Sequence, residues 1–211
     1  MIIAFDGNVF TGKTSLIEKL HQVEKSSVIP EHSHFLVDIA TGKDAWDIQK
    51  KYLDVERHRC EYLSNISSEK LILLDRSFVS MAAHVAALNV SRGIDIRSRF
   101  LRELVRDIRS GEVIIPGIFL FIRCDYGIIK ARALKDFVKN TDPFYYEQKY
   151  LEVVDNFNGR WQERFPGLII DTDASQSVQL GQLALIKEWA VSGASGYAMN
   201  DVCRHLGELL T

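Results

Sequence analysis

The stretch Met1-Ile2-Ile3-Ala4-Phe5-Asp6-Gly7-Asn8-Val9-Phe10-Thr11-Gly12-Lys13-Thr14 decides the fold. An apolar run precedes the pattern Gly-x4-Gly-Lys-Thr, and residues 15–20 continue with the spacing of a helix. Glycines let a backbone approach phosphate oxygens without a clash at Cβ. The N–H groups of such a turn and the start of the helix supply positive partial charge. The order strand, glycine turn, helix therefore predicts a phosphate-binding loop.

The residue types of this loop suit the phosphates and the metal of a nucleoside triphosphate. Lys13 has the reach to contact the β- and γ-phosphates, and the Thr14 hydroxyl can ligate Mg²⁺. A strand-to-helix turn with a chance lysine is the plain alternative, but spacing, flanks and position all favour the loop. The predicted nucleotide-binding residues are Gly7, Asn8, Val9, Phe10, Thr11, Gly12, Lys13, Thr14 and Ser15.

Length and composition indicate a soluble protein of one main domain. The chain has 211 residues, of which 46% are hydrophobic and 26% charged. Its net charge of -2 gives no electrostatic reason to expect a nucleic acid polymer or a membrane as partner. No apolar run approaches the roughly 20 residues of a membrane span. Three separated cysteines without a Cys-x-x-Cys pair predict reduced thiols and a cytoplasmic location. We also expect no signal peptide if the first strand begins at Met1.

Strand-like and helix-like segments alternate along the rest of the chain. This alternation predicts an α/β fold with a parallel sheet. After the first strand, further strands are expected near residues 26–30, 70–75, 117–124 and 168–171. Helices are expected near residues 13–24, 45–66, 78–89, 94–109, 126–138, 144–163 and 176–191.

The last twenty residues are expected to form a separate tail. Residues 1–191 make up the predicted main domain, and residues 192–211 a C-terminal helical tail with a flexible joint at 192–196. The apolar positions of the helix predicted near 197–210 favour packing on its own domain. A dimer contact is the sharper alternative.

Polar residues follow two of the predicted strands directly. Glu31 follows the second strand, and Asp75-Arg76 follows the third. Ligands of parallel sheets bind at the carboxyl ends of the strands, so these residues should share one crevice with the loop. Asp75 is placed to hold Mg²⁺, and Arg76 to neutralise a phosphate or orient Glu31. Glu31 can then accept or position the proton of a substrate hydroxyl. A solvated acid at Glu31 and a surface arginine at Arg76 are the plain alternatives.

A basic segment follows the fourth strand. Residues 123–139 hold five basic and two acidic residues, a net charge of +3. A mobile lid near 127–142 that closes over transferring phosphates fits this charge, and Arg132 is its best candidate for a catalytic cation. A solvated helix face is the alternative reading.

Aromatic residues near the second and third strands suggest where a base would stack. Trp46 and Tyr52 are candidates for stacking, while Gln49 or Arg57 can offer hydrogen bonds to the edge of the base. Each aromatic taken alone is more often part of the core.

Residues 1–172 resemble the deoxynucleoside kinase and thymidylate kinase group of phosphate-loop kinases. The Gly-Asn start of the loop is similar to that of deoxynucleoside kinases. Val28-Ile29-Pro30-Glu31 resembles the strand and glutamate that bind the sugar 5′-hydroxyl in that family. Asp75-Arg76-Ser77 resembles its Glu/Asp-Arg-Ser motif, and residues 128–161 resemble its lid and the helix after it.

This resemblance implies a three-layer P-loop fold with a five-stranded parallel sheet in the order 2-3-1-4-5. It implies ATP-dependent phosphorylation of a nucleoside 5′-hydroxyl with Mg²⁺, by a protein that is commonly a homodimer. A thymidylate kinase and a nucleotide-binding or hydrolytic regulator are the alternatives. The expected catalytic residues are Lys13, Glu31, Arg76 and Arg132, with metal contacts from Thr14 and Asp75. The expected substrate contacts are Glu31, Trp46, Gln49, Tyr52 and Arg76.

Three departures from the family pattern stand out. The lid has one clear arginine, Arg132, where deoxynucleoside kinases carry three close together. His32 follows the glutamate in place of the usual proline. The Arg-Glu-Pro-Gly-Gly sequence of many thymidylate kinases is absent after the second strand, so the nucleoside kinase ranks first.

Overall fold

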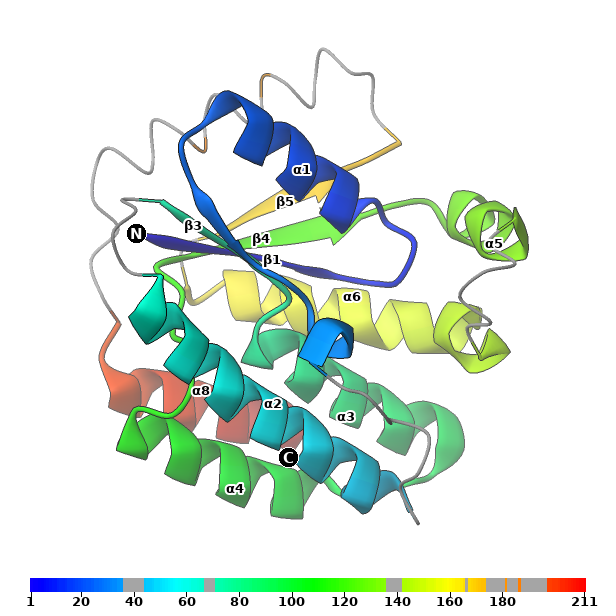
Figure 1. Ribbon diagram of the computed structural model, residues 1–211. Coiled ribbons are helices and arrows are strands. Elements are labelled where there is room, and N and C mark those ends of the chain that lie inside the picture. Colours follow the sequence, from blue (N-terminus) through cyan, green and yellow to red (C-terminus); the bar gives the residue numbers. More distant parts are fainter. Residues whose placement is uncertain are drawn as a thin grey trace.

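A computed structural model describes residues 1–35, 44–66, 71–135, 142–165, 167–173, 181, 186 and 197–211. A parallel sheet forms the middle layer, with helix α1 (Lys13–Val23) on one face (Figure 1). Helices α3 (Phe78–Arg92) and α6 (Gln148–Gln162) cover the other face (Figure 1). The predicted α/β layers are therefore confirmed.

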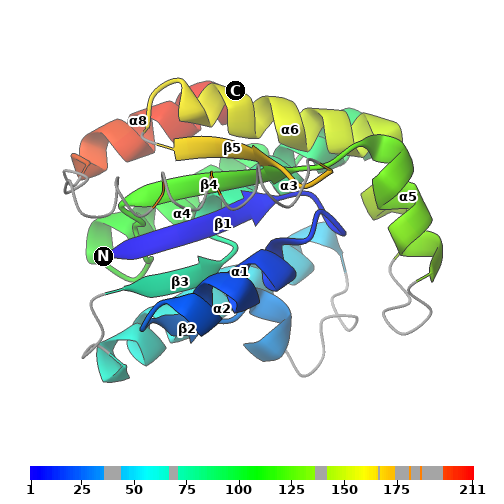
Figure 2. The same ribbon diagram turned by 90° about the horizontal axis from the view of Figure 1, so that it is seen from above.

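The sheet has five strands in the order β2-β3-β1-β4-β5, all parallel, as predicted. Its central strand β1 is almost wholly buried because both faces are covered by helices, which explains its continuous apolar sequence. The strands are β1 Ile2–Gly7, β2 Ser27–Ile29, β3 Ile72–Asp75, β4 Ile118–Arg123 and β5 Gly167–Asp171. Seen from above, all five point toward the end of the molecule where α5 (Tyr126–Lys135) lies (Figure 2).

The remaining helices follow the predicted pattern except at the unpredicted turn η1, at the end of α3 and at the start of the helix predicted from residue 144. They are η1 His32–Phe35, α2 Ala45–Asn65, α4 Arg97–Ser110, η3 Pro143–Tyr146 and α8 Met199–Leu210. Helix α3 continues past the predicted end at residue 89 until Gly93, whose φ of 67° stops it. The single helix predicted at 144–163 is wrong at its start: the Asp142 side chain caps a short 3₁₀ turn, and extended Glu147 separates this turn from α6.

Two apolar clusters hold the layers together. One lies between the sheet and α1, and a larger one joins the opposite face to α3, α4, α6 and α8. Trp161 of α6 is fully buried there, with its ring 5.6 Å from Phe78 and 5.5 Å from Phe119. Helix α8 adds buried Val202 and Leu206 to the same cluster. The C-terminal helix thus packs on its own chain. The helix predicted at 176–191 lies outside the described residues except for Gly181 and Ile186, and so does the joint at 192–196.

None of the described helices combines the length and the apolar character needed to cross a membrane.

Candidate functional site

The predicted phosphate loop turns sharply between β1 and α1. Gly7 has a φ of 131°, and a Cβ at this position would lie 2.2 Å from the carbonyl oxygen of Ile122 on β4. Only glycine fits such a close approach of two strands. Phe10 and Gly12 also have positive φ, 58° and 94°, which folds the loop back over the start of α1.

Asn8 fixes this loop to the helix on the opposite face of the sheet. Its Nδ2 donates to Asp155 Oδ1 at 2.8 Å and to the carbonyl of Leu151 at 3.2 Å, both on α6. Thr11 Oγ1 donates to the Asn8 carbonyl at 3.0 Å. Burial raises the pKa of Asp155 to about 6 against the opposing effects of Arg123 and of the Asn8 hydrogen bond. The Asn8 side chain therefore anchors the loop to α6.

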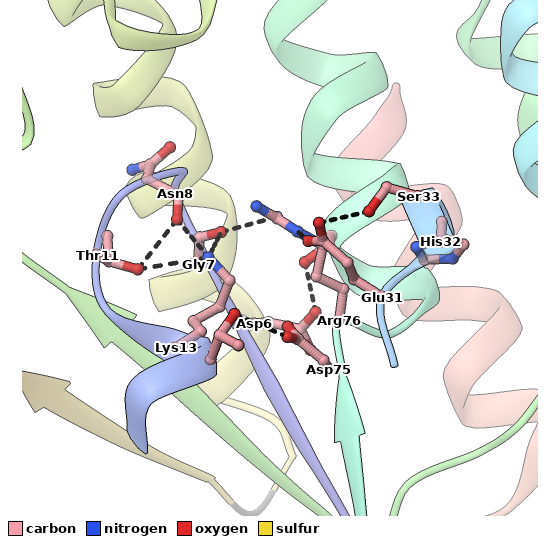
Figure 3. Close-up of polar contacts among 12 residues, drawn as sticks. Asp6, Gly7, Asn8, Thr11, Lys13, Glu31, His32, Ser33, Asp75 and Arg76 are labelled. Carbon is pink, nitrogen blue, oxygen red and sulfur yellow. Dashed lines mark hydrogen bonds and ion pairs between the residues drawn. The ribbon is translucent and has the colours of Figure 1, made fainter. Parts of the chain in front are cut away.

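Lys13 is buried and directed at the carbonyl oxygens of Gly7 and Asn8 (Figure 3). Burial, followed by repulsion from the Arg76 guanidinium, lowers its pKa to about 7, although nearby carboxylates oppose this. The Lys13 ammonium thus lies in the loop at a position where a bound anion would stabilise its charged form.

A cavity of about 620 Å³ opens over this loop. Residues 9–16 line it together with Glu31, Arg76, Arg132 and Thr172. Arg132 of α5 donates to the Phe10 carbonyl at 2.9 Å and lies 3.5 Å from Cys124 Sγ. The structure therefore brings the predicted lid arginine to the loop. Residues 136–141 of the predicted lid lie outside the described chain.

Thr14, in the first turn of α1, and Asp75, at the end of β3, meet beside the cavity. Thr14 Oγ1 donates to Asp75 Oδ2 at 3.1 Å. The other oxygen, Asp75 Oδ1, is buried and has no hydrogen-bond partner among the described residues. The described ranges contain no cluster of three His, Cys, Asp or Glu side chains that could hold a metal ion. A hydroxyl and one carboxylate with a free oxygen fit Mg²⁺, which takes its other ligands from water and substrate phosphates.

Glu31 and Arg76 form an ion pair at the ends of β2 and β3 (Figure 3). Arg76 Nε lies 3.2 Å from Glu31 Oε2, and Arg76 Nη1 donates to the Gly7 carbonyl at 3.0 Å. Ser33 Oγ donates to Glu31 Oε1 at 2.6 Å. Burial acts to raise the pKa of Glu31, but Arg76 outweighs it and, with Ser33 and Lys13, lowers the pKa to about 2. Glu31 is therefore a carboxylate at every physiological pH.

A second cavity, of about 310 Å³, lies on the other side of this ion pair. Glu31, Arg76 and Val9 line both cavities. The second is further lined by aromatic and polar side chains, among them Gln49, Tyr52, His84, Tyr145 and Tyr150. Gln49 Nε2 is buried and has no partner within the described ranges, so it can donate to a ligand.

His84 lies in the wall of this second cavity in its neutral form. Burial, together with repulsion from Arg76, lowers its pKa to about 4. Its Nδ1 lies 2.9 Å from the hydroxyl of Tyr150, and its ring stacks on Tyr145 at 5.7 Å.

Two of the residues that the sequence suggested for contact with a base, Trp46 and Arg57, line neither cavity. Trp46 is 8% exposed and packs in the large apolar cluster, with the Arg99 guanidinium 4.2 Å from its ring. Arg57 pairs with Asp107 at 2.6 Å and with Asp54. Both side chains lie on α2, but they point to α4 or to the core instead of toward Gln49 and Tyr52.

Sequence reasoning missed Asp6 and Tyr150. Asp6 is fully buried and accepts from the Ser77 amide at 2.8 Å and from Ser77 Oγ at 2.7 Å. It also accepts from Ser80 Oγ, so it joins the end of β1 to the start of α3. A charged residue inside an otherwise apolar strand was the available signal for Asp6. No local signal marks Tyr150, because only the fold brings α6 to His84.

Comparisons with known proteins give a match at the level of structure. No protein-family model and no curated protein matches the sequence. The deoxyadenosine kinase of M. mycoides, solved with dCMP and dCDP, matches with a TM-score of 0.68 and 14% identity, over 89% of this chain and 99% of that one. The thymidylate kinase of Candida albicans matches with a TM-score of 0.60 and 15% identity, over 89% of this chain and 91% of that one. The predicted resemblance is confirmed in the fold, which is that of nucleoside and nucleotide kinases.

Proposed function

We propose that the protein is a kinase that transfers the γ-phosphoryl group of ATP to the 5′-hydroxyl of a nucleoside. One observation carries this proposal: Glu31 and Arg76 line both the cavity over the phosphate loop and the aromatic cavity next to it. A carboxylate and a guanidinium at the junction of two cavities suit a reaction between a donor and an acceptor. A single-substrate hydrolase needs no second cavity of about 310 Å³.

On the donor side, catalysis would rest on positioning and charge. Lys13 and the loop amides would bind the β- and γ-phosphates, and Arg132 would stabilise charge on the transferring group. Thr14 and Asp75 would hold Mg²⁺, which when bound neutralises phosphate charge. These roles fit the buried Lys13 ammonium and the contact of Arg132 with the loop carbonyl.

On the acceptor side, Glu31 would accept a hydrogen bond from the nucleoside hydroxyl. Its pKa of about 2 keeps it ionised, but it also makes Glu31 a weak base toward an unreacted hydroxyl. In a loose phosphoryl-transfer transition state, the hydroxyl proton becomes acidic only as the new bond forms. Glu31 therefore orients the oxygen first and takes the proton late, while Arg76 holds the carboxylate in place.

The charges around the second cavity favour a nucleoside over a nucleoside monophosphate. Arg76 is the single cation among the described residues that line it, and Glu31 already pairs with it. His84 is neutral, and Asp142 adds a second carboxylate. Binding an acceptor phosphate commonly takes arginines that are free to form paired hydrogen bonds. The thymidylate kinase alternative is therefore not favoured.

The test is ATP turnover by the purified protein with separate additions of nucleosides, nucleoside monophosphates or no acceptor. The expected result is ADP formation that depends on a nucleoside and is much slower with monophosphates. ADP formation at the same rate with and without an added acceptor would refute the kinase and support a hydrolytic regulator. A preference for monophosphates would support the thymidylate kinase alternative. A cytoplasmic location and a homodimer stay predictions that this assay does not address.

A further inference from the structure

A cluster of buried charged and polar groups lies next to the acceptor-side ion pair, and one of its members, His32, also lines the second cavity. His32, Glu56 and Arg59 are 3%, 0% and 0% exposed. Glu56 Oε2 lies 3.0 Å from His32 Nε2 and 2.8 Å from Arg59 Nη1. Arg59 Nη1 is itself 3.0 Å from His32 Nε2, so each of the three groups contacts both others.

This cluster touches the backbone on both sides of the ion pair. His32 directly follows Glu31 at the end of β2. Arg59 Nη2 donates to the carbonyl of Asp75 at 2.8 Å and to the carbonyl of Arg76 at 2.9 Å, at the end of β3. Helix α2, which carries Glu56 and Arg59, thereby fixes the ends of two strands in one geometry.

The backbone at Arg76 needs such support. Its φ of 64° lies in the left-handed region, which residues with a Cβ adopt at a cost. This conformation turns the Arg76 side chain toward Glu31 and the Gly7 carbonyl. Two hydrogen bonds from Arg59 on the flanking carbonyls hold the peptide in that conformation.

Stability alone is a poor reason for this arrangement. A buried ion pair often stabilises a fold no more than apolar residues of similar volume would, because its desolvation is costly. Here the polar groups are also incompletely satisfied: Glu56 Oε1 and Arg59 Nε are buried without a partner in the described part of the chain. Incomplete satisfaction makes desolvation costlier still.

We propose that His32, Glu56 and Arg59 are positioning residues that set the geometry of Glu31 and Arg76 for the acceptor hydroxyl. The expected effect on kcat rests on the proposed nucleoside kinase function. The expected effect on the positions of Glu31 and Arg76 does not. Replacing the charged pair by apolar side chains should leave the fold intact and misplace Glu31 and Arg76.

The test uses the double variant Glu56→Leu/Arg59→Met, which removes both charges together and leaves none unpaired. The matched control is Arg57→Met/Asp107→Leu, which removes a neighbouring ion pair between α2 and α4 whose residues line neither cavity. The test variant should keep a cooperative thermal transition and bind ATP as the wild type does. Its kcat with a nucleoside should fall about 10²-fold, as expected when reacting groups are misplaced by an ångström. The control should keep the wild-type kcat.

Crystal structures of the same variants give a readout that does not depend on the reaction. In the test variant Arg76 should leave the left-handed region, and its contact with Glu31 should open from the present 3.2 Å. If the wild type phosphorylates no nucleoside, the proposed function fails, and this structural readout alone decides the positioning role. Wild-type kcat in the test variant, or an unchanged Arg76 and Glu31 in its structure, would overturn the proposal. If the double variant does not fold, Arg59→Lys decides the question by the same readouts, because it keeps the buried charge but loses the paired hydrogen bonds of the guanidinium to the Asp75 and Arg76 carbonyls.

Discussion

At the scale of single residues, we expect Lys13 to take up a proton when Mg²⁺·ATP binds. Its ammonium is buried against the Gly7 and Asn8 carbonyls, and its pKa is lowered to about 7. At about pH 8 most of this lysine is neutral, and phosphates beside it would raise its pKa again. Binding of Mg²⁺·ATP at that pH should therefore take up a fraction of a proton per site. Titration calorimetry in two buffers of different ionisation enthalpy measures this uptake.

The same titration at lower pH is its control. Below the lowered pKa, at about pH 6, Lys13 is already protonated, and the uptake that it causes should vanish. An uptake that is zero at about pH 8, or that is the same at both pH values, would contradict the lowered pKa of Lys13.

Removing the charge of Glu31 should slow nucleoside phosphorylation. Glu31→Gln keeps the size of the side chain but removes the charge that Arg76 and Ser33 hold in place. The kcat for nucleoside phosphorylation should fall by about 10²–10⁴-fold, the usual contribution of a proton-accepting group. ATP affinity should change little. Because the pKa of Glu31 is about 2, the wild-type rate should show no loss from this group above about pH 4.

Ser33→Ala provides a graded comparison for Glu31. It removes a single hydrogen bond to Oε1 and leaves Arg76 in place. Its effect on kcat should be well below that of Glu31→Gln, and equal losses in the two variants would contradict a direct role of Glu31.

At the scale of elements, helix α5 delivers one arginine to the phosphate loop. Arg132 contacts the Phe10 carbonyl, while Lys130 on the same helix is exposed near the Tyr126 ring. Arg132→Ala should lower kcat by about 10³-fold or more, as for other arginines that stabilise phosphoryl transfer. Lys130→Ala should leave kcat near the wild-type value. Steady-state kinetics of both variants shows whether Arg132 acts specifically or whether the helix acts through its overall positive charge.

The elements of this fold could be predicted because their signals are local. Apolar runs give β1, β3 and β4, and glycine turns give the loop after β1 and the end of α3. Glu31 after β2 and Asp75 at the end of β3 reach one crevice because the carboxyl ends of parallel strands share an edge. Prediction failed where a short side chain competes with the helix, as Asp142 does at the start of η3.

The side-chain networks behind the site could not be predicted in this way. His32 and Glu56 are 24 positions apart, and Asp6 and Ser77 are 71 apart. No periodicity connects such pairs, since only the packing of α2 and α3 against the strand ends brings them together. Trp46 shows the converse: its place among the aromatic residues near the second and third strands suggested stacking on a base, but its side chain faces the core.

At the scale of the whole molecule, the C-terminal helix is part of the core. Leu206 of α8 is fully buried in the large apolar cluster. Leu206→Ala should lower the free energy of unfolding by about 2–5 kcal/mol, the range for a leucine truncated in a core. Arg204→Ala, on the exposed side of α8, should cost less than about 1 kcal/mol. Urea denaturation compares the two, and equal small effects would indicate that α8 is not docked on this chain.

One crevice is proposed to bind a donor and an acceptor and to transfer a phosphoryl group between them. The most direct measurement follows label from ATP that is radioactive in its γ-phosphate, with a nucleoside present. In the wild type the label should appear in a nucleoside 5′-monophosphate, and in folded Lys13→Ala the transfer should be abolished. Label found only in inorganic phosphate, or transfer by Lys13→Ala near the wild-type rate, would contradict the account.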